Sequence, residues 1–440
     1  MMTMENKIHI VYVLPEFITE KAAGGLATYY DNIARMLTDA GNKVTVFVLS
    51  DVDEVFSYYP GIDVHRVFVD ETRVDSMVPS SFMRLWSKGI NKAVKRYREA
   101  GNNIDLIQYA NYLGLGFERM DDIPTVIRIS SFQPYMRAAA KYIFDPKTRH
   151  KCETAADYLE MLSVIKADAV YSPSSLLKGI INDEIEREVK VIESPFYPKA
   201  AHGKSIACEI TIGKKYIITF STLNILKGAK IIGDSINEVL DRNKDVFWVF
   251  AGVEVPWTDD NGKTIYPSDY ILNNAGENKD RVIFLGKVKH EELLDVVEKA
   301  ALCVMPSRID NLPNTCIEAM AMGKVVIGTR DASFDQLIVD EESGFLVERE
   351  NKKDLIRVID RALQLEPEQI KNISIKAKKR IEAMKKDKIL DEIMTFYVGA
   401  INDFNGCAQY SSNKHYVLMK ELYNKALRMC GRENIDDYIL

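Results

Sequence analysis

Short apolar runs and longer amphipathic segments alternate along most of the chain. In the first half, apolar and β-branched runs predict strands at 7–15, 42–50, 104–111, 124–131 and 168–174. The second half repeats the alternation, with strands predicted at 214–222, 245–252, 280–286, 302–307, 324–329 and 344–348. Because these runs are almost continuously apolar, they indicate parallel sheets that helices cover on both faces. The pattern therefore predicts an α/β fold with two doubly wound, Rossmann-like sheets.

The boundary between the two halves is predicted in the segment Ile192–Ile210, which contains two prolines and a glycine and is typical of a linker. We expect an N-terminal domain at 1–197, a C-terminal domain at 198–395 and a helical end at 396–440. In open α/β sheets, ligands bind beyond the carboxyl ends of the strands. Two such sheets that face each other would therefore enclose a cleft.

Composition limits the class of protein. The 440 residues are 47% hydrophobic, which is sufficient for large cores, and the net charge of −6 argues against binding nucleic acid over a whole surface. The six cysteines are scattered without a CxxC pair, which is typical of free thiols in a reducing compartment. The N-terminus lacks a signal-peptide pattern, and no run of about 18 apolar residues occurs. We expect a cytoplasmic protein, with peripheral contact to the inner face of a membrane as the alternative.

Two segments that follow predicted strands are candidates for binding phosphate. Gly24 and Gly25 precede a helix, where backbone amides can hold an anion, although the spacing is not GxGxxG. A flexible turn that lets the helix pack on its strand explains the same residues. Lys227 and Gly228 open a later helix, where a cation is unfavourable for the helix dipole unless an anion binds beside it. The alternative for Lys227 is an ordinary exposed lysine.

The stretch PSRIDNLPNTCIEAMAMGKVVIG, at 306–328, places the carboxylate of Glu318 in an apolar helix, where a charge is unfavourable unless it is paired. The helix is expected to begin near Asn314 or Thr315, which would put Glu318 in the first turn, where an anion favours the dipole. The alternative explanation is a ligand. Glu318 can accept two hydrogen bonds from a ribose diol, Asp310 can bind sugar hydroxyls, and loop amides between Asn311 and Asn314 can hold phosphate oxygens.

Several segments together resemble family 4 of the retaining glycosyltransferases (glycosyl transferases group 1), which has the GT-B fold. The resemblance to the nucleotide-sugar half of this family rests on LNILKG, VIFLGKV followed by HEEL, PSRIDNLPNTCIEAMAMGKVVIG and DEESGFLV. The segments GGLATYYDNIARMLTDAGNKVTVF and KADAVYSPSSLL resemble the acceptor half. This resemblance implies two Rossmann-like domains facing each other across a deep cleft. It also implies that the C-terminal helices pack back on the N-terminal domain.

The resemblance implies roles for named residues. Asp310 would bind the donor sugar, Glu318 the nucleotide ribose and Lys227 the donor diphosphate, and these three form the predicted catalytic set. The donor site would be completed by Gly24, Gly25, Thr222, Val288, Asn311, Leu312, Pro313 and Asn314. Contacts to the base come largely from backbone near Val288, so the sequence does not specify the base.

This sequence departs from the family pattern at the diphosphate. Five residues before Lys227 the family usually has an arginine, which acts as a second clamp, and this chain has Thr222. Arg128 and Arg308 are the candidates for a cation that replaces it.

A second departure lies near the end of the predicted strand 124–131. Many members of the family have a histidine there that contacts the sugar, and this chain has Ser130 or Ser131 instead. The identity of the donor sugar is therefore not predicted. We expect Arg128 and Ser130 to take part in binding the acceptor.

By this resemblance, the chain transfers a hexose-type sugar from a UDP- or GDP-linked donor to a glycan, lipid-linked or small-molecule acceptor, with retention of configuration. In front-face transfer the leaving diphosphate assists deprotonation of the acceptor hydroxyl, and protein cations can stabilise the diphosphate without a metal or other cofactor. The implied context is biosynthesis of cell-surface polysaccharide or glycoconjugates. Two alternatives stay open, a nucleotide-sugar 2-epimerase of the same fold and a non-catalytic sugar-nucleotide-binding protein.

Two further patterns have both a functional and an ordinary explanation. Asp51-Val52-Asp53 is a DxD, which elsewhere binds a manganese–diphosphate complex, but acidic strand ends are common and we expect no metal site. Residues 80–101 predict a basic amphipathic helix, which either covers the sheet or contacts an anionic membrane surface.

Overall fold

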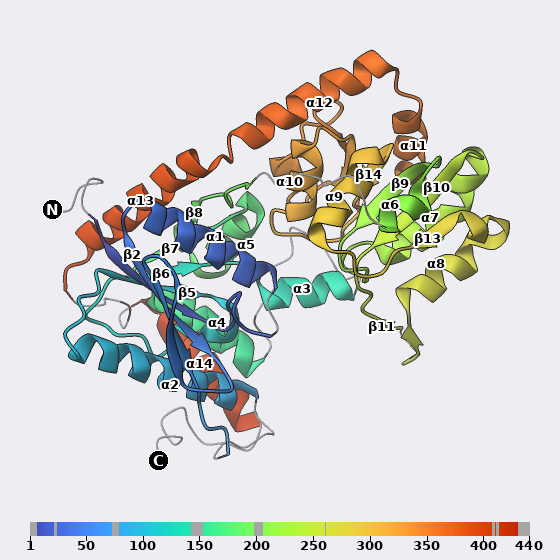
Figure 1. Cartoon of the computed structure of the whole chain (residues 1–440). Helices are drawn as coiled ribbons and strands as arrows, with labels where there is room; N and C mark the ends of the chain where they lie inside the picture. The colour runs from blue at the N-terminus through green and yellow to red at the C-terminus, as the bar shows by residue number, and fades with distance from the viewer. Residues whose placement is uncertain are drawn as a thin grey trace. The chain divides into compact units, whose positions relative to one another are not determined.

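The computed structural model describes residues 7–21, 24–72, 79–141, 152, 154–197, 206–259, 261–406, 410 and 413–429 (Figure 1). Contacts between residues divide the chain into two units. Unit 1 comprises Met1–Tyr135, Lys147–Pro195 and Lys386–Leu440, and unit 2 comprises Met136–Pro146 and Phe196–Lys385. The last helices of the chain therefore belong to unit 1, and unit 2 ends at Lys385, before the boundary expected at 395.

Unit 1 is built on an eight-stranded sheet with the order β3-β4-β2-β1-β5-β6-β7-β8. The strands are β1 (His9–Leu14), β2 (Lys43–Leu49), β3 (Glu54–Tyr59), β4 (Ile62–Val67), β5 (Leu106–Ala110), β6 (Thr125–Arg128), β7 (Ala169–Ser172) and β8 (Lys190–Val191). All neighbours are parallel except β3 and β4, which form an antiparallel edge that the sequence analysis did not predict. The prediction of a doubly wound parallel sheet is confirmed.

Helices cover both faces of this sheet (Figure 1). They are α1 (Gly25–Asp39), α2 (Pro79–Glu99), α4 (Ala155–Lys166), α5 (Ser175–Ile185), α13 (Lys386–Asp403) and α14 (Lys414–Met429). The boundary between the units at Tyr135 falls within α3 (Gln133–Ala140). In α2, the apolar residues Ile90 and Val94 are fully buried, so this part of the basic amphipathic helix covers the sheet, as the ordinary explanation of residues 80–101 predicts.

A network of buried hydroxyl groups joins α13 to the core of unit 1. The hydroxyl of Tyr397 donates to Oε1 of Gln108, on β5, at 2.5 Å, and lies 3.3 Å from the hydroxyl of Tyr12, on β1. Nε2 of Gln108 in turn donates to the hydroxyl of Tyr171 at 2.8 Å. These groups are buried among apolar side chains, where an unpaired polar group costs about 1–3 kcal/mol. Each group therefore depends on the others, and α13 is an integral part of unit 1.

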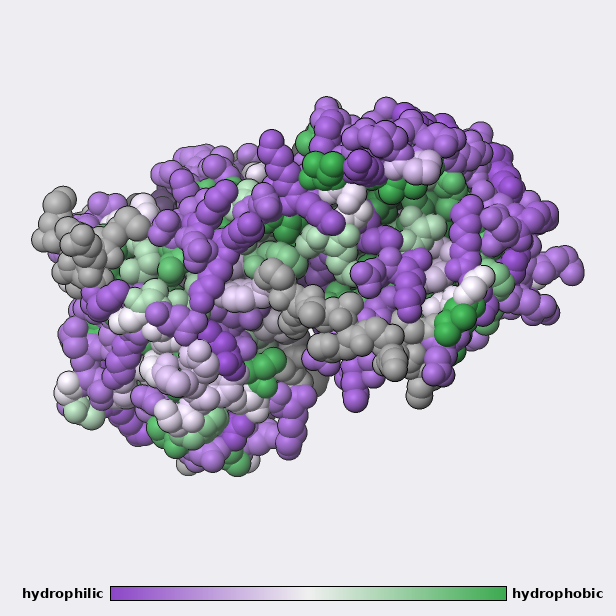
Figure 2. All heavy atoms as spheres, turned by 45° about the horizontal axis from the view of Figure 1, so that its top comes forward, coloured by the Kyte–Doolittle hydropathy of each residue, from purple (hydrophilic) through white to green (hydrophobic). Residues whose placement is uncertain are grey.

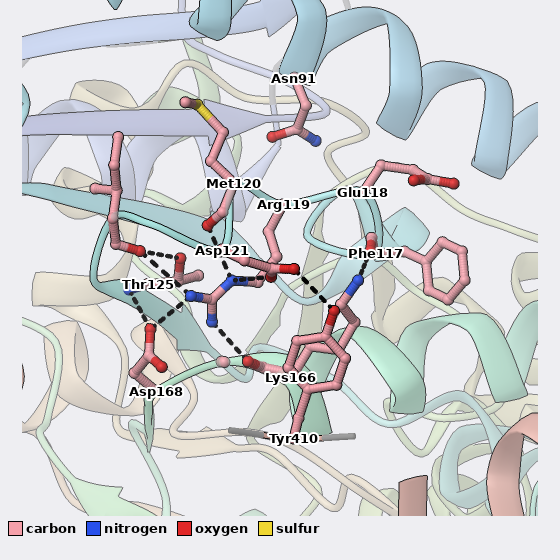
Figure 3. A network of polar contacts seen from close by, with 12 residues as sticks. Asn91, Phe117, Glu118, Arg119, Met120, Asp121, Thr125, Lys166, Asp168 and Tyr410 are labelled. Atoms are coloured by element: carbon pink, nitrogen blue, oxygen red, sulfur yellow. Dashed lines mark hydrogen bonds and ion pairs between the residues drawn. The ribbon is translucent and has the colours of Figure 1, made fainter. Parts of the chain in front are cut away.

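Near the amino ends of strands β6 and β7, a second network surrounds the guanidinium of Arg119 (Figure 3). Arg119 donates to Oδ2 of Asp168 at 2.8 Å and to the carbonyl oxygen of Lys166 at 2.6 Å. The same carboxylate oxygen of Asp168 accepts from the amide of Thr125 at 2.8 Å. The side chain of Arg119 is fully buried, and its charge is balanced by Asp168, as a buried charge requires.

Unit 2 contains a six-stranded parallel sheet with the order β13-β10-β9-β14-β15-β16. Its strands are β9 (Lys215–Phe220), β10 (Val246–Ala251), β13 (Val282–Phe284), β14 (Leu302–Val304), β15 (Val326–Thr329) and β16 (Phe345–Val347), with a hairpin of β11 (Trp257–Thr258) and β12 (Thr264–Ile265). Its helices are α6 (Ile206–Thr211), α7 (Ala229–Arg242), α8 (Pro267–Ala275), α9 (His290–Lys299), α10 (Asn314–Ala321), α11 (Lys352–Leu363) and α12 (Pro367–Glu382). The order of the strands reverses between β9 and β14, and such a switch point is where open α/β sheets bind ligands.

The surface in Figure 2 is mainly hydrophilic, and its hydrophobic residues appear in small separate groups. Every helix in the described part of the chain is too short or too polar to cross a bilayer.

Candidate functional site

Two loops of unit 2 meet at the switch point of its sheet. One follows β9 and contains Lys227, and the other follows β14 and contains Asp310. The amide of Arg308 donates to the carbonyl oxygen of Leu226 at 2.8 Å, which joins the two loops through their backbones. Gly228 adopts φ +85°, and a Cβ atom there would lie 2.2 Å from the carbonyl oxygen of Pro306. Only glycine permits this close approach, so Gly228 fixes the position of Lys227 relative to the second loop.

The side chains of Lys227 and Asp310 form an ion pair, with Nζ of Lys227 at 2.5 Å from Oδ2 of Asp310. The lysine is 28% exposed and the aspartate 12% exposed, so both groups can still reach a ligand. The backbone amide of Lys227 donates to Oδ1 of Asn224 at 2.9 Å, and the hydroxyl of Ser333 donates to the carbonyl oxygen of Asp310 at 2.9 Å. The structure thus brings together two of the three predicted catalytic residues.

The loop after Asp310 leads directly into helix α10. Leu312 has φ +57°, in the left-handed region that a leucine rarely adopts, and its side chain is buried in the core. Pro313 is the N-cap of α10, and Asn314 is its first residue and is exposed. Because the side chain of Leu312 faces the core, only its backbone is available to a donor. Strained backbone beside a candidate ligand site is typical of functional loops.

Glu318 is the fifth residue of α10, which begins at Asn314. The expectation that Glu318 lies in the first turn is therefore wrong, and the helix dipole does not explain its charge. Its carboxylate instead lies 2.8 Å from Nε2 of His290, the first residue of α9. The side chain of Glu318 is 22% exposed, so it is paired but still accessible.

His290 is a residue of this site that the sequence analysis missed. Nδ1 of His290 is buried without a hydrogen-bond partner in the described part of the chain, which leaves Glu318 as the residue that orients the ring. The available signal was the position of His290 directly after the LGKVK segment, in the HEEL motif that carries the resemblance.

A cavity of about 330 Å³ lies at the carboxyl ends of β9 and β10 in unit 2. Gly286 and Lys287 line it, next to the position predicted for the base, and Val288 itself packs half-buried against the core. The stacked rings of Phe250 and Phe284, 4.9 Å apart between centroids, line the apolar side. This volume and lining suit a flat heterocycle.

Thr222 is half-buried and lies in the same loop as Lys227. Arg308, one of the two cations expected to replace the missing arginine, is 1% exposed and is held by Glu350, whose Oε1 lies 2.7 Å from Nε. Burial is the larger effect and lowers the pKa of Arg308, whereas the neighbouring carboxylate of Glu350 raises that pKa. Because its charge is already balanced inside unit 2, Arg308 is a structural residue in this conformation.

Gly24 is the N-cap of α1 in unit 1, and Gly25 is the first residue of that helix. The carboxylate of Glu16 accepts from the amides of Gly24, at 3.3 Å, and Ala27, at 3.1 Å. The first turn of α1 therefore already holds an anionic group of the protein itself. A donor phosphate would have to displace Glu16 to use the Gly24 amide.

Arg128 and Ser130, the predicted acceptor-binding residues, lie together at the carboxyl end of β6 in unit 1. Nη1 of Arg128 donates to the hydroxyl of Ser130 at 2.6 Å. In the DxD, Oδ1 of Asp53 accepts from the amide of Phe68 at 2.9 Å, whereas Asp51 is exposed and lies 3.8 Å from the exposed Lys21. In the described ranges, no three His, Cys, Asp or Glu residues are grouped as a metal site would need.

Comparisons with known proteins agree with this architecture. Residues 209–380 match the family model described as glycosyl transferases group 1. The chain is 27% identical over 159 residues to an uncharacterized glycosyltransferase of Methanocaldococcus jannaschii, a match that covers 32% of this chain and 45% of that relative. The chain spans about half the length of the first curated relatives that it matches.

Solved structures share the fold along most of the chain, and two of them serve as examples. Sucrose-phosphate synthase from Thermosynechococcus elongatus superposes with a TM-score of 0.68 at 17% identity, covering 90% of this chain and all of that chain (100%). Anabaena HepE in complex with UDP and glucose superposes with a TM-score of 0.63 at 16% identity, covering 89% of this chain and 100% of that chain. The chain has the GT-B fold of two Rossmann-like units. The match of residues 209–380 supports a relationship to the glycosyl transferases group 1.

Proposed function

We propose that the chain is a retaining, metal-independent glycosyltransferase of family 4 that binds a nucleotide-diphosphate sugar in unit 2. The observation that carries this proposal is the pairing of Lys227 with Asp310 across the switch point of the sheet. The two loops that supply them are joined by backbone contacts, so their geometry is set before any ligand binds. The carboxylate of Glu318 lies on the helix that begins at the end of the second loop.

The donor diphosphate is proposed to bind between Lys227 and the backbone amides at the start of α10. A diphosphate carries more negative charge than Asp310, so it can replace the carboxylate as the partner of the lysine ammonium. Asp310 is then released to accept hydrogen bonds from sugar hydroxyls. Pro313, the N-cap, has no N–H, and the amide of Asn311 donates to Oδ1 of Asp310 at 3.0 Å. The amides of Leu312 and Asn314 are therefore the proposed phosphate donors at this helix start, where anions are favoured.

Glu318 is proposed to accept hydrogen bonds from the ribose diol, with His290 holding its carboxylate in position. The cavity beside Val288 is proposed to take the base, of a UDP- or GDP-linked donor. HepE is a solved neighbour that was crystallised with UDP and glucose, which agrees with a donor of this class.

In the proposed reaction, the bond between the sugar and the diphosphate breaks as the acceptor hydroxyl attacks from the same face. The leaving diphosphate oxygen takes the proton of that hydroxyl. The chain contributes electrostatic stabilisation: Lys227 and the amides of α10 balance charge that develops on the diphosphate. Unit 1 is proposed to supply the acceptor site through Arg128 and Ser130. The acceptor class proposed is a glycan, a lipid-linked sugar or a small molecule of cell-surface biosynthesis.

A second candidate is a non-catalytic protein that binds sugar nucleotides. Thr222 stands at the usual arginine position and Arg308 is held by Glu350, and these two observations favour it, because neither residue then supplies the second diphosphate clamp. Turnover separates the two functions.

The test is a thermal-shift panel with UDP, GDP, ADP, CMP and dTDP in EDTA. A ligand at about 100 times its Kd adds roughly 2.7 kcal/mol of stability, so one nucleotide should raise the midpoint clearly. Incubation with the corresponding nucleotide sugars and acceptors, with the anomeric product read by NMR, then tests transfer and retention. Binding without turnover would favour the non-catalytic protein, inversion would contradict the retaining mechanism, and release of an epimer without acceptor would favour an epimerase.

A further inference from the structure

Among the residues that the structure describes, Arg128 differs from the other two buried arginines, Arg119 and Arg308, because it has no carboxylate partner. The structure buries Arg119, Arg128 and Arg308 to 6%, 5% and 1% exposure. Arg119 pairs with Asp168 (Figure 3) and Arg308 pairs with Glu350. Among the described residues, no aspartate or glutamate forms an ion pair with Arg128, and its guanidinium contacts neutral groups instead. An uncompensated buried charge is unfavourable, so the site is electrostatically incomplete.

The neutral neighbours of Arg128 form a partial cradle. Nη1 donates to the hydroxyl of Ser130 at 2.6 Å and Nη2 to the hydroxyl of Ser194 at 3.3 Å. The guanidinium carbon lies 3.6 Å from the centre of the ring of Tyr29, whose negative face attracts a cation. Nε is buried and has no hydrogen-bond partner in the part of the chain that the structure describes.

The position of Arg128 in the sheet is that of a ligand site. It is the last residue of β6, next to the carboxyl ends of β5 and β7, where parallel sheets bind ligands. Ser130 and Ser194 are half-buried, so the cradle keeps an accessible side. The amide of Ser130 is held by Oδ1 of Asn111 at 2.7 Å, which fixes the backbone of this edge. The hydroxyl of Ser194 accepts from Arg128, and its own proton can therefore be donated to a ligand.

We infer that Arg128, Ser130 and Ser194 form an oxyanion-binding site, and that the acceptor of the proposed transferase carries a phosphate or carboxylate group that binds there. This deepens the proposed function and rests on it for the role of the ligand. The anion supplies the negative charge that Arg119 and Arg308 receive from protein carboxylates. It also gives the free Nε of Arg128 a hydrogen-bond partner, which a fork-shaped guanidinium favours.

The experiment titrates the full chain with sodium phosphate and, separately, sodium succinate, against sodium chloride at equal ionic strength, and follows the unfolding midpoint. Phosphate or succinate should raise the midpoint of the wild type, and sodium chloride should not. Arg128→Gln should abolish the increase in the midpoint, and Arg128→Lys should keep part of that increase. Ser194→Ala should weaken anion affinity by about tenfold. UDP and GDP should stabilise Arg128→Gln as much as the wild type, which tests the donor site independently.

The stability of the variants without ligand separates binding from structure. Arg128→Gln should keep or raise the unfolding midpoint, because it removes an unbalanced buried charge, whereas Arg119→Gln should lower it by leaving Asp168 unpaired. The inference is overturned if neither anion stabilises the wild type, or if the increase in the midpoint persists in Arg128→Gln. It is also overturned if Arg128→Gln loses nucleotide binding, because Arg128 would then bind the donor. If Arg128→Gln does not fold, Ser194→Ala decides the question, since unchanged anion affinity there would overturn the site. If no nucleotide binds the wild type but phosphate or succinate does, the proposed function is overturned and the anion site stands.

Discussion

Nζ of Lys227 lies 2.5 Å from Oδ2 of Asp310, although 83 residues separate them in the sequence. The pair joins the loops that follow β9 and β14, between which the sheet of unit 2 reverses its order. Both side chains keep some exposure, so the pair contributes about 1 kcal/mol or less to folding. A contribution this small does not explain why two loops are fixed to bring the charges together, whereas a ligand that takes the place of Asp310 does.

Replacing the lysine tests this explanation. Lys227→Ala should raise the Kd of UDP or GDP about 10- to 100-fold, because a charge-assisted hydrogen bond contributes roughly 1.5–3 kcal/mol. Isothermal titration measures the change. Lys230→Ala is the matched control, since Lys230 is the second residue of α7, forms a 2.7 Å pair with Asp234 and belongs to no predicted donor contact. Equal losses of nucleotide affinity in the two variants would contradict the assignment of Lys227.

The close contact at Gly228 predicts a specific loss of stability and binding. Gly228→Ala must accommodate both φ +85° and an oxygen of Pro306 at 2.2 Å from the new Cβ atom. The loops have to separate, so we expect a loss of about 3 kcal/mol or more in unfolding free energy, together with loss of nucleotide binding. Urea unfolding of the full chain measures the first effect.

Gly213→Ala is the control for backbone strain, because Gly213 has φ +70° and no atom lies within 4 Å of the position that the new methyl group would take. It should lose only about 1 kcal/mol and keep full nucleotide affinity. If Gly213→Ala and Gly228→Ala are equally destabilising, strain alone explains the effect and the contact with Pro306 has no special role.

The sequence predicts much of this site because strand ends in a parallel sheet converge on one edge. The positions of Lys227 and Asp310 after two apolar strands are sufficient to expect them in one ligand site. The pairing of Glu318 with His290 was not predictable in the same way. It depends on how the starts of α9 and α10 pack against each other, and residue spacing along the sequence does not specify that packing.

The antiparallel edge of unit 1 and the capping of α1 by Glu16 were missed for a related reason. Strand β3 is largely exposed and lacks the apolar continuity that identified the other strands. Glu16 accepts from the amide of Ala27, eleven positions later in the chain, and nothing in the local pattern distinguishes it from a surface carboxylate. Sequence reasoning therefore finds buried strands and their ends, but not polar contacts made at a distance.

Glu318 and Lys227 can be distinguished by the part of the donor that each contacts. Glu318→Gln should weaken UDP or GDP binding about tenfold and leave inorganic pyrophosphate binding unchanged, because only the nucleotide carries a ribose diol. Lys227→Ala should weaken both ligands. His290→Gln should produce a smaller nucleotide effect than Glu318→Gln, since it removes only the group that orients the carboxylate. If Glu318→Gln weakens pyrophosphate binding as much as nucleotide binding, the carboxylate lies near the phosphates instead.

A buried histidine, His9, and a half-buried one, His65, predict an acid-sensitive unit 1. Burial, the largest cause, lowers the pKa of His9 and of His65 below the ordinary value of 6.5. The unfolded chain therefore binds more protons than the folded chain once the pH falls below about 6.5, and stability is lost as the pH falls further. The free energy of unfolding should be level above this value and then decrease by at most about 1.4 kcal/mol per pH unit for each histidine.

Urea unfolding at intervals between pH 7.5 and 5.5 measures this slope. His65→Gln should reduce it, because the variant has no proton to gain at that position. His415→Gln is the control, since it leaves His9 and His65 in place. A slope that His65→Gln does not change would show that His65 is not responsible for the loss of stability.

The hydroxyl of Tyr397 predicts how strongly α13 is held in unit 1. Tyr397→Phe removes the donor to Oε1 of Gln108 and leaves that oxygen unpaired among buried side chains. We expect a loss of about 1–3 kcal/mol, because an unsatisfied buried acceptor bears its full desolvation cost. Tyr59→Phe is the matched control: its hydroxyl donates to Oδ1 of Asp39 at 3.0 Å at the surface, where water can replace the lost bond. Its loss should stay below about 0.5 kcal/mol. Equal effects of the two substitutions in urea unfolding would mean that the core network does not anchor α13.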